Sequence, residues 1–189
     1  TFREAPHGPV ADPDLFTDDN SFLATTGRRI PVYFHSEHRQ LPWCREIWPV
    51  PRLEMNPADA AELGLEQGDW ECIETEWGKV RQTVDLYEGI AKGWANAEHA
   101  WWYPELPAPT HGFELSCIDC IWDPNGQDKF IGSSHMRGVP VKIYKATPEN
   151  CPDGQVIPCA PEDGTPIIAD ASDPRLKEWL PNYDIREEA

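Results

Sequence analysis

Apolar and polar positions alternate with a period of two through the middle of the chain, and this pattern predicts short β-strands. The clearest case spans residues 70–76 and 80–87, two alternating segments joined by a glycine turn at residues 77–79, so we predict a β-hairpin. Further strands are expected at residues 21–25, 52–55, 94–97 and 139–144. Because Pro140 has no backbone N–H, the last strand is expected at a sheet edge or beside a bulge.

One segment carries a full set of helix signals. Asn56 can cap the first turn, Pro57 suits the first helical position, and Gly64 follows the apolar face of Ala60 and Leu63. We therefore predict a helix of about two turns at residues 56–64.

Weaker signals predict the other segments. A short helix is expected within residues 38–48, ended by Pro49, and a short docking helix at residues 176–180. Residues 105–135 are rich in proline and glycine and are predicted to be a loop.

Short strands around a capped helix predict a small closed β-barrel with helical inserts. A chain of 189 residues is long enough for one such domain with extensions. We predict an extended arm at residues 1–20, the barrel at 21–146, and a proline- and acid-rich tail at 147–189.

Charge and hydropathy narrow the function classes. A net charge of −17 and a pI near 4.6 argue against nucleic acid as a partner, since phosphate neutralisation needs a basic face. No apolar run approaches 18 residues, so we expect no membrane span in this chain. The chain begins at Thr1 without a methionine, which predicts a segment of a longer protein. We expect a prokaryotic source, and the compartment stays open between cytoplasm and export.

The cysteines allow three interpretations. Cys117 and Cys120 have the spacing of metal ligands, and Cys151 with Cys159 forms a second pair, so the four could bind zinc or form two disulfides. Cys44 and Cys72 stand in apolar, strand-like surroundings that are typical of buried free thiols. Zinc, disulfides and free thiols all stay open, with free thiols favoured.

A basic island interrupts this acidic chain. It runs from Thr25 to Arg39 and contains hydroxyls, histidines, arginines and Gly27. Glycine lets the backbone approach a ligand, and guanidinium groups suit phosphate oxygens, so the island predicts a phosphate-type anion site. The aromatic cluster at residues 99–104 is either a wedge of core aromatics at the barrel rim or a stacking surface for a flat heterocycle.

Several segments follow one another in a recognisable order: Thr25 to Arg28, Phe34-His35-Ser36, residues 56–65, Gly68-Asp69-Trp70, residues 98–102, Asp123-Pro124 and residues 136–145. In order and spacing the chain resembles the C-terminal molybdopterin-dinucleotide-binding domain of the dimethyl sulfoxide reductase family of molybdenum or tungsten enzymes. The resemblance covers roughly residues 20–146. It implies a mainly β (α+β) fold, a six-stranded double-psi β-barrel with short helical inserts and irregular N- and C-terminal extensions.

The resemblance also implies a set of cofactor-binding residues. They are Thr26, Gly27, Arg28, His35 and Ser36 in the glycine-turn loops, Trp102 at an aromatic position, Asp119, and Arg137 before the last strand. We expect them to form one pocket, with no catalytic residue and no metal ligand in this chain. Two positions depart from the family. Ala100 stands where many members have glycine, so a less tight turn is expected, and Asp119 replaces part of a paired asparagine motif and can accept but not donate.

As function, the resemblance implies binding and orienting the pterin guanine dinucleotide of a molybdenum or tungsten bis-molybdopterin guanine dinucleotide (bis-MGD) cofactor, in the C-terminal segment of a larger oxidoreductase. Its substrate would be a sulfur, arsenic or hydroxylated organic compound. Expected partners are the N-terminal catalytic domains of the same polypeptide, which would carry any iron–sulfur cluster, and an iron–sulfur electron-transfer subunit. The isolated domain is predicted to be inactive. The alternatives are a stand-alone double-psi binding or interaction module and a small cofactor-binding subunit.

Overall fold

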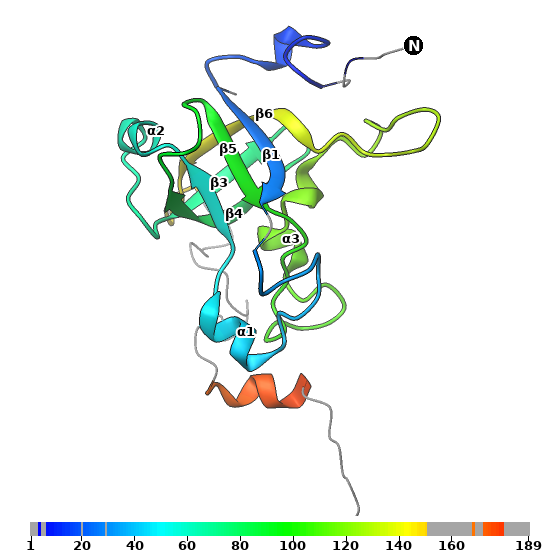
Figure 1. The fold of residues 1–189 in the computed structure, drawn as a ribbon. Helices are drawn as coiled ribbons and strands as arrows, with labels where there is room; N and C mark the ends of the chain where they lie inside the picture. Colours follow the sequence, from blue (N-terminus) through cyan, green and yellow to red (C-terminus); the bar gives the residue numbers. More distant parts are fainter. Residues whose placement is uncertain are drawn as a thin grey trace, which may run out of the picture.

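Six strands close into a β-barrel in the computed structural model, which describes residues 4, 7–19, 21–28, 30–150, 168 and 172–179 (Figure 1). In chain order the strands are β1 (Phe22–Arg28), β2 (Arg52–Met55), β3 (Trp70–Thr75), β4 (Gly78–Leu86), β5 (Trp94–Glu98) and β6 (Arg137–Lys145). Each predicted strand is present, and β3 and β4 form the predicted antiparallel hairpin.

Six short helices lie outside the barrel strands in the described part of the chain. They are η1 (Pro13–Leu15), α1 (Pro42–Ile47), α2 (Pro57–Glu62), α3 (Phe113–Ser116), η2 (Ile118–Ile121) and η3 (Pro174–Trp179). The helix predicted from Asn56 is confirmed as α2, because the Asn56 side chain accepts a hydrogen bond from the Ala58 N–H at 3.0 Å. The helix expected within residues 38–48 is α1, and η3 overlaps the one expected at residues 176–180, with Leu176 buried; Leu180 lies outside the described residues.

The prediction of a plain loop at residues 105–135 is wrong. Helices α3 and η2 lie within it, and neither has a side-chain cap that sequence could reveal. The residue before α3 is Gly112 in the left-handed conformation, φ 65°, which reads as a loop signal in the sequence.

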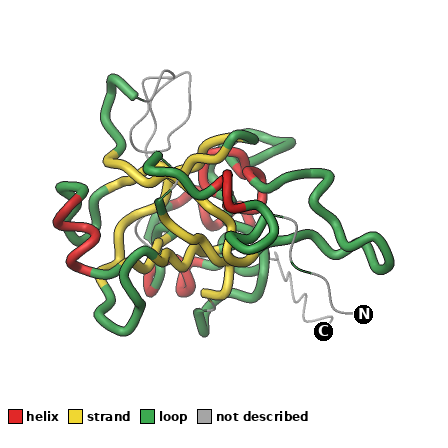
Figure 2. The backbone as a smooth tube through the Cα atoms, turned by 90° about the horizontal axis from the view of Figure 1, so that it is seen from above, coloured by secondary structure: helices red, strands yellow, loops and turns green. Residues whose placement is uncertain are grey.

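The strand order around the barrel is β1-β5-β2-β4-β3-β6. Two neighbouring pairs, β1/β5 and β2/β4, are parallel, and the other contacts are antiparallel. Exchanging the first three strands with the last three leaves both the order and the strand directions unchanged. Two equivalent halves therefore interlock, and the six-stranded double-psi β-barrel is confirmed. Figure 2 shows the strands gathered at the centre and long loops extending from them.

Pro140 does not mark an edge, because β6 pairs with β1 on one side and with β3 on the other. The bulge alternative holds. The register between β1 and β6 shifts between Ala24 and Thr25, and the skipped residue is Gly138, whose φ of +70° suits glycine.

The barrel interior is largely apolar, with fully buried Ala24, Leu53, Ile73 and Val84 among its members. Glu71 is the exception on β3. It lies two residues from Ile73, so its side chain faces the same side of the strand, and it is fully buried. Its carboxyl oxygens have no hydrogen-bond partner among the described residues, and burial raises the pKa of this carboxyl well above its usual range.

A second cluster of buried aromatics joins the barrel to α1. Trp101 and Tyr103 pack there with Tyr33, and Trp101 is fully buried, so the core-wedge interpretation is correct for that residue. The buried ion pair Arg45–Glu105 crosses the cluster at 3.1 Å, and Glu105 also accepts from the Ile168 N–H at 2.6 Å. Figure 1 shows this layer of α1 and loops below the barrel.

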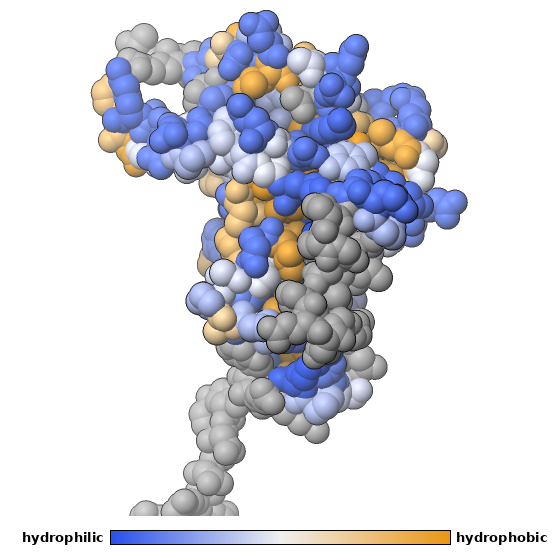
Figure 3. All heavy atoms as spheres, turned by 180° about the vertical axis from the view of Figure 1, so that it is seen from behind, coloured by the Kyte–Doolittle hydropathy of each residue, from blue (hydrophilic) through white to orange (hydrophobic). Residues whose placement is uncertain are grey.

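The described part of the chain has no helix of the length and apolarity needed to cross a membrane. Hydrophilic residues cover much of the face in Figure 3, with apolar patches between them. Cys44, Cys72, Cys117 and Cys120 are free thiols, and no cluster of three or more His, Cys, Asp or Glu among the described residues could hold a metal ion. Cys151 and Cys159 lie outside the described residues. The division into arm, barrel and tail stays a prediction.

Candidate functional site

The ends of β1 and β6 meet beside a cavity of about 440 Å³, here called the rim cavity. The residues that line it are Thr26, His35, His99, Ala100, Asp119, Ser134, His135, Met136 and Arg137. Thr26 lies in a stretch of β1 where the register with β5 shifts, and both its N–H and its hydroxyl donate to the Met136 carbonyl oxygen at 3.3 Å. Four of the eight predicted site residues, from four separate segments, therefore surround one cavity.

Ser36 and Trp102 line a different cavity of about 560 Å³, together with residues of the loop before α3 and of its first turn. The Trp102 indole N–H donates to the Ser36 carbonyl oxygen at 2.5 Å, and its ring lies 5.6 Å from that of His111. The expectation of one pocket completed by Trp102 and Arg137 is therefore wrong. His35 lines the rim cavity and the neighbouring Ser36 lines the second one, so the loop carrying them contributes to both.

Gly27 lines neither of these two cavities, and the side chain of Arg28 lies outside the described residues. Gly27 is exposed in β1, and a Cβ there would lie 3.5 Å from Asn96 Oδ1, an ordinary contact, so packing does not require glycine. The Arg28 backbone pairs with Glu98, and its side chain lies outside the described residues. Both assignments remain predictions.

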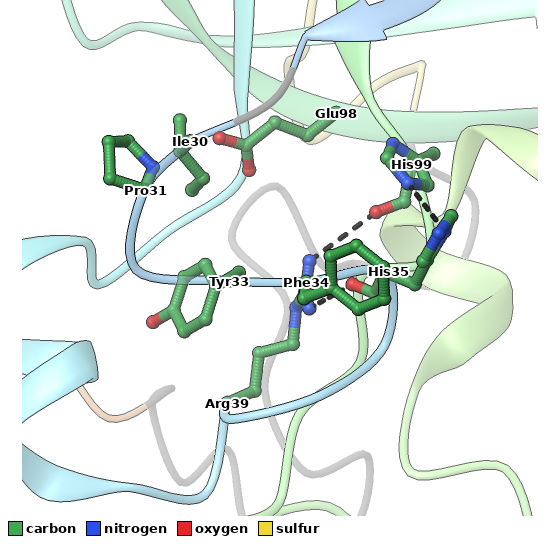
Figure 4. Close-up of a pocket in the computed structure, with 8 residues that line it drawn as sticks. All are labelled: Ile30, Pro31, Tyr33, Phe34, His35, Arg39, Glu98 and His99. Atoms are coloured by element: carbon green, nitrogen blue, oxygen red, sulfur yellow. Dashed lines mark hydrogen bonds between the residues drawn. The ribbon is translucent and has the colours of Figure 1, made fainter.

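Arg39, from the same basic island, has a structural role. It is 2% exposed and donates to three backbone carbonyl oxygens, those of His35, Glu37 at 3.1 Å and His99 at 3.4 Å. Figure 4 shows this guanidinium turned toward the backbone of His35 and His99, beside a cavity of about 270 Å³. It also lies 4.5 Å from the ring centroid of Tyr33. Burial lowers the pKa of Arg39 to about 10, so the group stays charged at neutral pH and is committed to these contacts rather than to phosphate.

The loop that Arg39 holds is strained. His35 and His38 have φ values of 51° and 75°, a region that residues other than glycine seldom adopt. His35 Nδ1 lies 3.2 Å from His99 Nε2, so when both rings are neutral one ring donates a hydrogen bond and the other accepts it. The tautomers of the two rings are therefore linked at the wall of the rim cavity.

Asp119 holds the turn after β5. The Ala100 N–H donates to Asp119 Oδ2 at 2.9 Å, and the Cys117 thiol donates to the same oxygen at 3.3 Å. Ala100 has a φ of 54°, the left-handed conformation that favours glycine, so the expectation of a looser turn at this position is wrong. The carboxylate stabilises this strained backbone by accepting a hydrogen bond from the Ala100 N–H.

Sequence reasoning missed His135. It lines the rim cavity, its Nε2 donates to the Arg137 carbonyl oxygen at 2.6 Å, and its ring stacks 6.4 Å from that of His7. Burial lowers the pKa of His135, so its Nδ1 keeps a lone pair, and this atom has no hydrogen-bond partner among the described residues. The run His135-Met136-Arg137 just before a predicted strand was the available signal.

The rim cavity thus combines an exposed arginine, hydroxyls, imidazoles and one carboxylate, groups suited to a ligand that is both anionic and rich in polar ring atoms. A family model described as "Molydopterin dinucleotide binding domain" matches residues 22–119. The chain belongs to this family, whose members are domains of molybdenum oxidoreductases, and its place in the dimethyl sulfoxide reductase family is confirmed.

Individual relatives refine this placement. Dopamine dehydroxylase from Eggerthella lenta is 57% identical over 187 residues, which cover 99% of this chain and 18% of that protein. Acetylene hydratase from Syntrophotalea acetylenica is 25% identical over 76% of this chain and 20% of its own length. The solved acetylene hydratase from Pelobacter acetylenicus superimposes with a TM-score of 0.69 at 24% identity, over 77% of this chain and 21% of that one, and supports the fold. The chain spans about a fifth of these relatives.

Proposed function

We propose that this chain binds and orients a pterin guanine dinucleotide of a bis-MGD cofactor, as the C-terminal segment of a larger molybdenum or tungsten oxidoreductase. The observation that carries the proposal is the rim cavity, which gathers Thr26, His35, Asp119 and Arg137 from four segments. The family match supports the ligand class.

The donors and acceptors present fit such a ligand. Arg137 would contact phosphate oxygens, while the Thr26 hydroxyl oxygen, Asp119 and the His135 Nδ1 would accept from N–H groups of a heterocycle. When bound, the cofactor supplies the oxidation–reduction chemistry at its metal. The residues of this chain bind it, orient it and limit access of water, and Arg39 keeps His35 and Ser36 in place for that purpose.

For the substrate, we infer a hydroxylated aromatic compound that is dehydroxylated. The 57% identity to dopamine dehydroxylase extends over the predicted arm and tail as well as the barrel, whereas acetylene hydratase matches 76% of the chain at 25% identity. N-terminal catalytic domains of the same polypeptide and an iron–sulfur electron-transfer subunit belong to this proposal, and the chain alone is expected to be inactive.

The test uses the full-length enzyme with Arg137→Gln in the rim cavity and Lys142→Gln as a matched control. Lys142 is an exposed cation on the same strand, paired with Asp19 at 3.3 Å, and it lines none of the cavities described above. Loss of one charge-assisted hydrogen bond of about 1.5–3 kcal/mol predicts roughly 10- to 150-fold faster loss of extractable pterin and guanine nucleotide on dialysis. Equal retention in both variants would refute the assignment of the cavity.

The substrate proposal needs its own assay. The reduced enzyme is offered catechols, sulfoxides and arsenate separately, and consumption of an electron donor is followed. Turnover with catechols alone supports dehydroxylation. Turnover with a sulfoxide or arsenate instead refutes it and leaves the binding proposal intact.

A further inference from the structure

Cys117 and Cys120 stand at the two ends of one turn, next to Asp119 of the rim cavity. The Cys120 N–H donates to the Cys117 carbonyl oxygen at 3.0 Å, and η2 begins at the residue after Cys117 and contains Cys120. A hydrogen bond from residue i+3 to residue i holds their Cα atoms within about 7 Å, and disulfides span roughly 4.4–6.8 Å. The Cα separation is therefore compatible with a disulfide, and both groups are free thiols.

The two thiols differ in a way that suits thiol–disulfide exchange. Cys120 is exposed, whereas Cys117 is completely buried. The neighbouring Cys117 side chain lowers the pKa of Cys120, and burial raises the pKa of Cys117. An accessible thiol with a stabilised thiolate beside a protected second thiol is the arrangement found in redox-sensing pairs.

We propose that Cys117 and Cys120 form a reversible disulfide on reaction with a small-molecule disulfide, and that this oxidation loosens the Ala100 turn at the rim cavity. This modification site lies beyond the cofactor-binding function and does not depend on it.

The exchange has two steps. The Cys120 thiolate attacks one sulfur of the small disulfide, forms a mixed disulfide and expels one thiolate. The Cys117 thiol, 3.3 Å from Asp119 Oδ2, then loses its proton toward that carboxylate and attacks the Cys120 sulfur, expelling the second thiolate. Two protein thiols lose two electrons and two protons, and one small disulfide becomes two thiols.

The consequence for the cavity follows from a shared acceptor. Asp119 Oδ2 accepts from both the Cys117 thiol and the Ala100 N–H. Oxidation removes the thiol proton and draws Cys117 toward Cys120, so the carboxylate loses one of the two contacts that fix it. Ala100 is held at a φ of 54°, and its turn also carries His99 into the rim cavity. We therefore expect the turn to open more often when the disulfide is present.

The experiment exposes the full-length protein to graded mixtures of reduced and oxidised glutathione, followed by acid quenching, alkylation and mass spectrometry. The peptide containing both cysteines should escape alkylation and weigh two hydrogens less than its free dithiol form, reversibly on addition of dithiothreitol. Cys120→Ser should abolish this product, and Cys44 and Cys72, buried on α1 and β3, should remain reduced.

A second readout follows amide hydrogen exchange at residues 99–102, which should rise several-fold on oxidation of the wild type and stay constant in Cys120→Ser. Only glutathione on Cys120, without the internal disulfide, would overturn the pairing. A disulfide that leaves exchange at residues 99–102 unchanged would overturn the coupling to the cavity. Cys120→Ser is suited to this test because its side chain is exposed and its replacement leaves the buried Cys117 contact in place.

Discussion

Arg39 offers the sharpest test of how the site is held. Its guanidinium bonds three carbonyl oxygens on the loop before α1 and on the turn after β5, and it lies against the Tyr33 and Trp101 rings. Arg39→Gln removes the charge and most of this reach. Arg39→Lys keeps the charge but loses the planar fork.

The magnitude follows from these contacts. A hydrogen bond to a charged group contributes about 1.5–3 kcal/mol and a buried cation–π contact about 2 kcal/mol, and such contributions are not additive. Because the carbonyl groups of His35 and His99 also lose their donor, we expect Arg39→Gln to cost about 3–5 kcal/mol locally. Arg39→Lys should cost about half of that, since one ammonium can satisfy only part of the set.

Amide hydrogen exchange of the protein measures this directly. A local loss of about 3 kcal/mol corresponds to exchange on the order of 100-fold faster at residues 33–39 and 98–101. The β3–β4 hairpin serves as the internal reference. Arg52→Gln is the matched control, because Arg52 lies 3.8 Å from the Trp48 ring and should cost only about 1 kcal/mol. The reasoning fails if Arg39→Gln exchanges like the wild type, or if Arg39→Lys restores the loop completely.

Three further outcomes follow from the structure. Burial raises the pKa of Glu71, so the stability tied to its protonated form is complete below the unfolded-state pKa and is lost as pH rises. The gain in melting temperature from Glu71→Gln should therefore increase between about pH 5 and about pH 8. A difference in melting temperature that does not depend on pH would contradict this. Glu105→Gln leaves the buried Arg45 without its counter-charge and should destabilise by about 3–5 kcal/mol in denaturant unfolding, against almost nothing for an exposed carboxyl such as Glu88. Ala100→Gly removes left-handed strain and should stabilise by up to about 1 kcal/mol, which a lower melting temperature would disprove.

The sequence predicted the elements that depend only on residues close together along the chain. Asn56 and Pro57 start α2 through a local cap, and the hairpin turn needs only its own residues. The strand pattern predicted a closed barrel, but its double-psi arrangement came from the family resemblance, because the pairing of β1 with β6 joins segments more than a hundred residues apart, beyond any local pattern.

The sequence predicted several residues of the site, but not how those residues are arranged in space. Contacts that shape it join distant residues: Arg39 and His99 are 60 apart, His35 and His99 64, and Trp102 and Ser36 66. The last of these draws Trp102 into a separate cavity, which no spacing rule could show. Likewise, Arg39 has the same chemistry as a phosphate ligand, and only its burial reveals its structural role.

The interlocked topology also sets when the site can exist. The rim cavity has walls from β1, which starts at Phe22, and from the segment that enters β6, which ends at Lys145. During synthesis the first strand must wait, unpaired along one side, until the last has left the ribosome. Such high contact order slows folding, since long loops must close before their contacts form. Any ligand of this cavity can therefore be captured only after the whole barrel has been synthesised, which makes loading a late step in maturation.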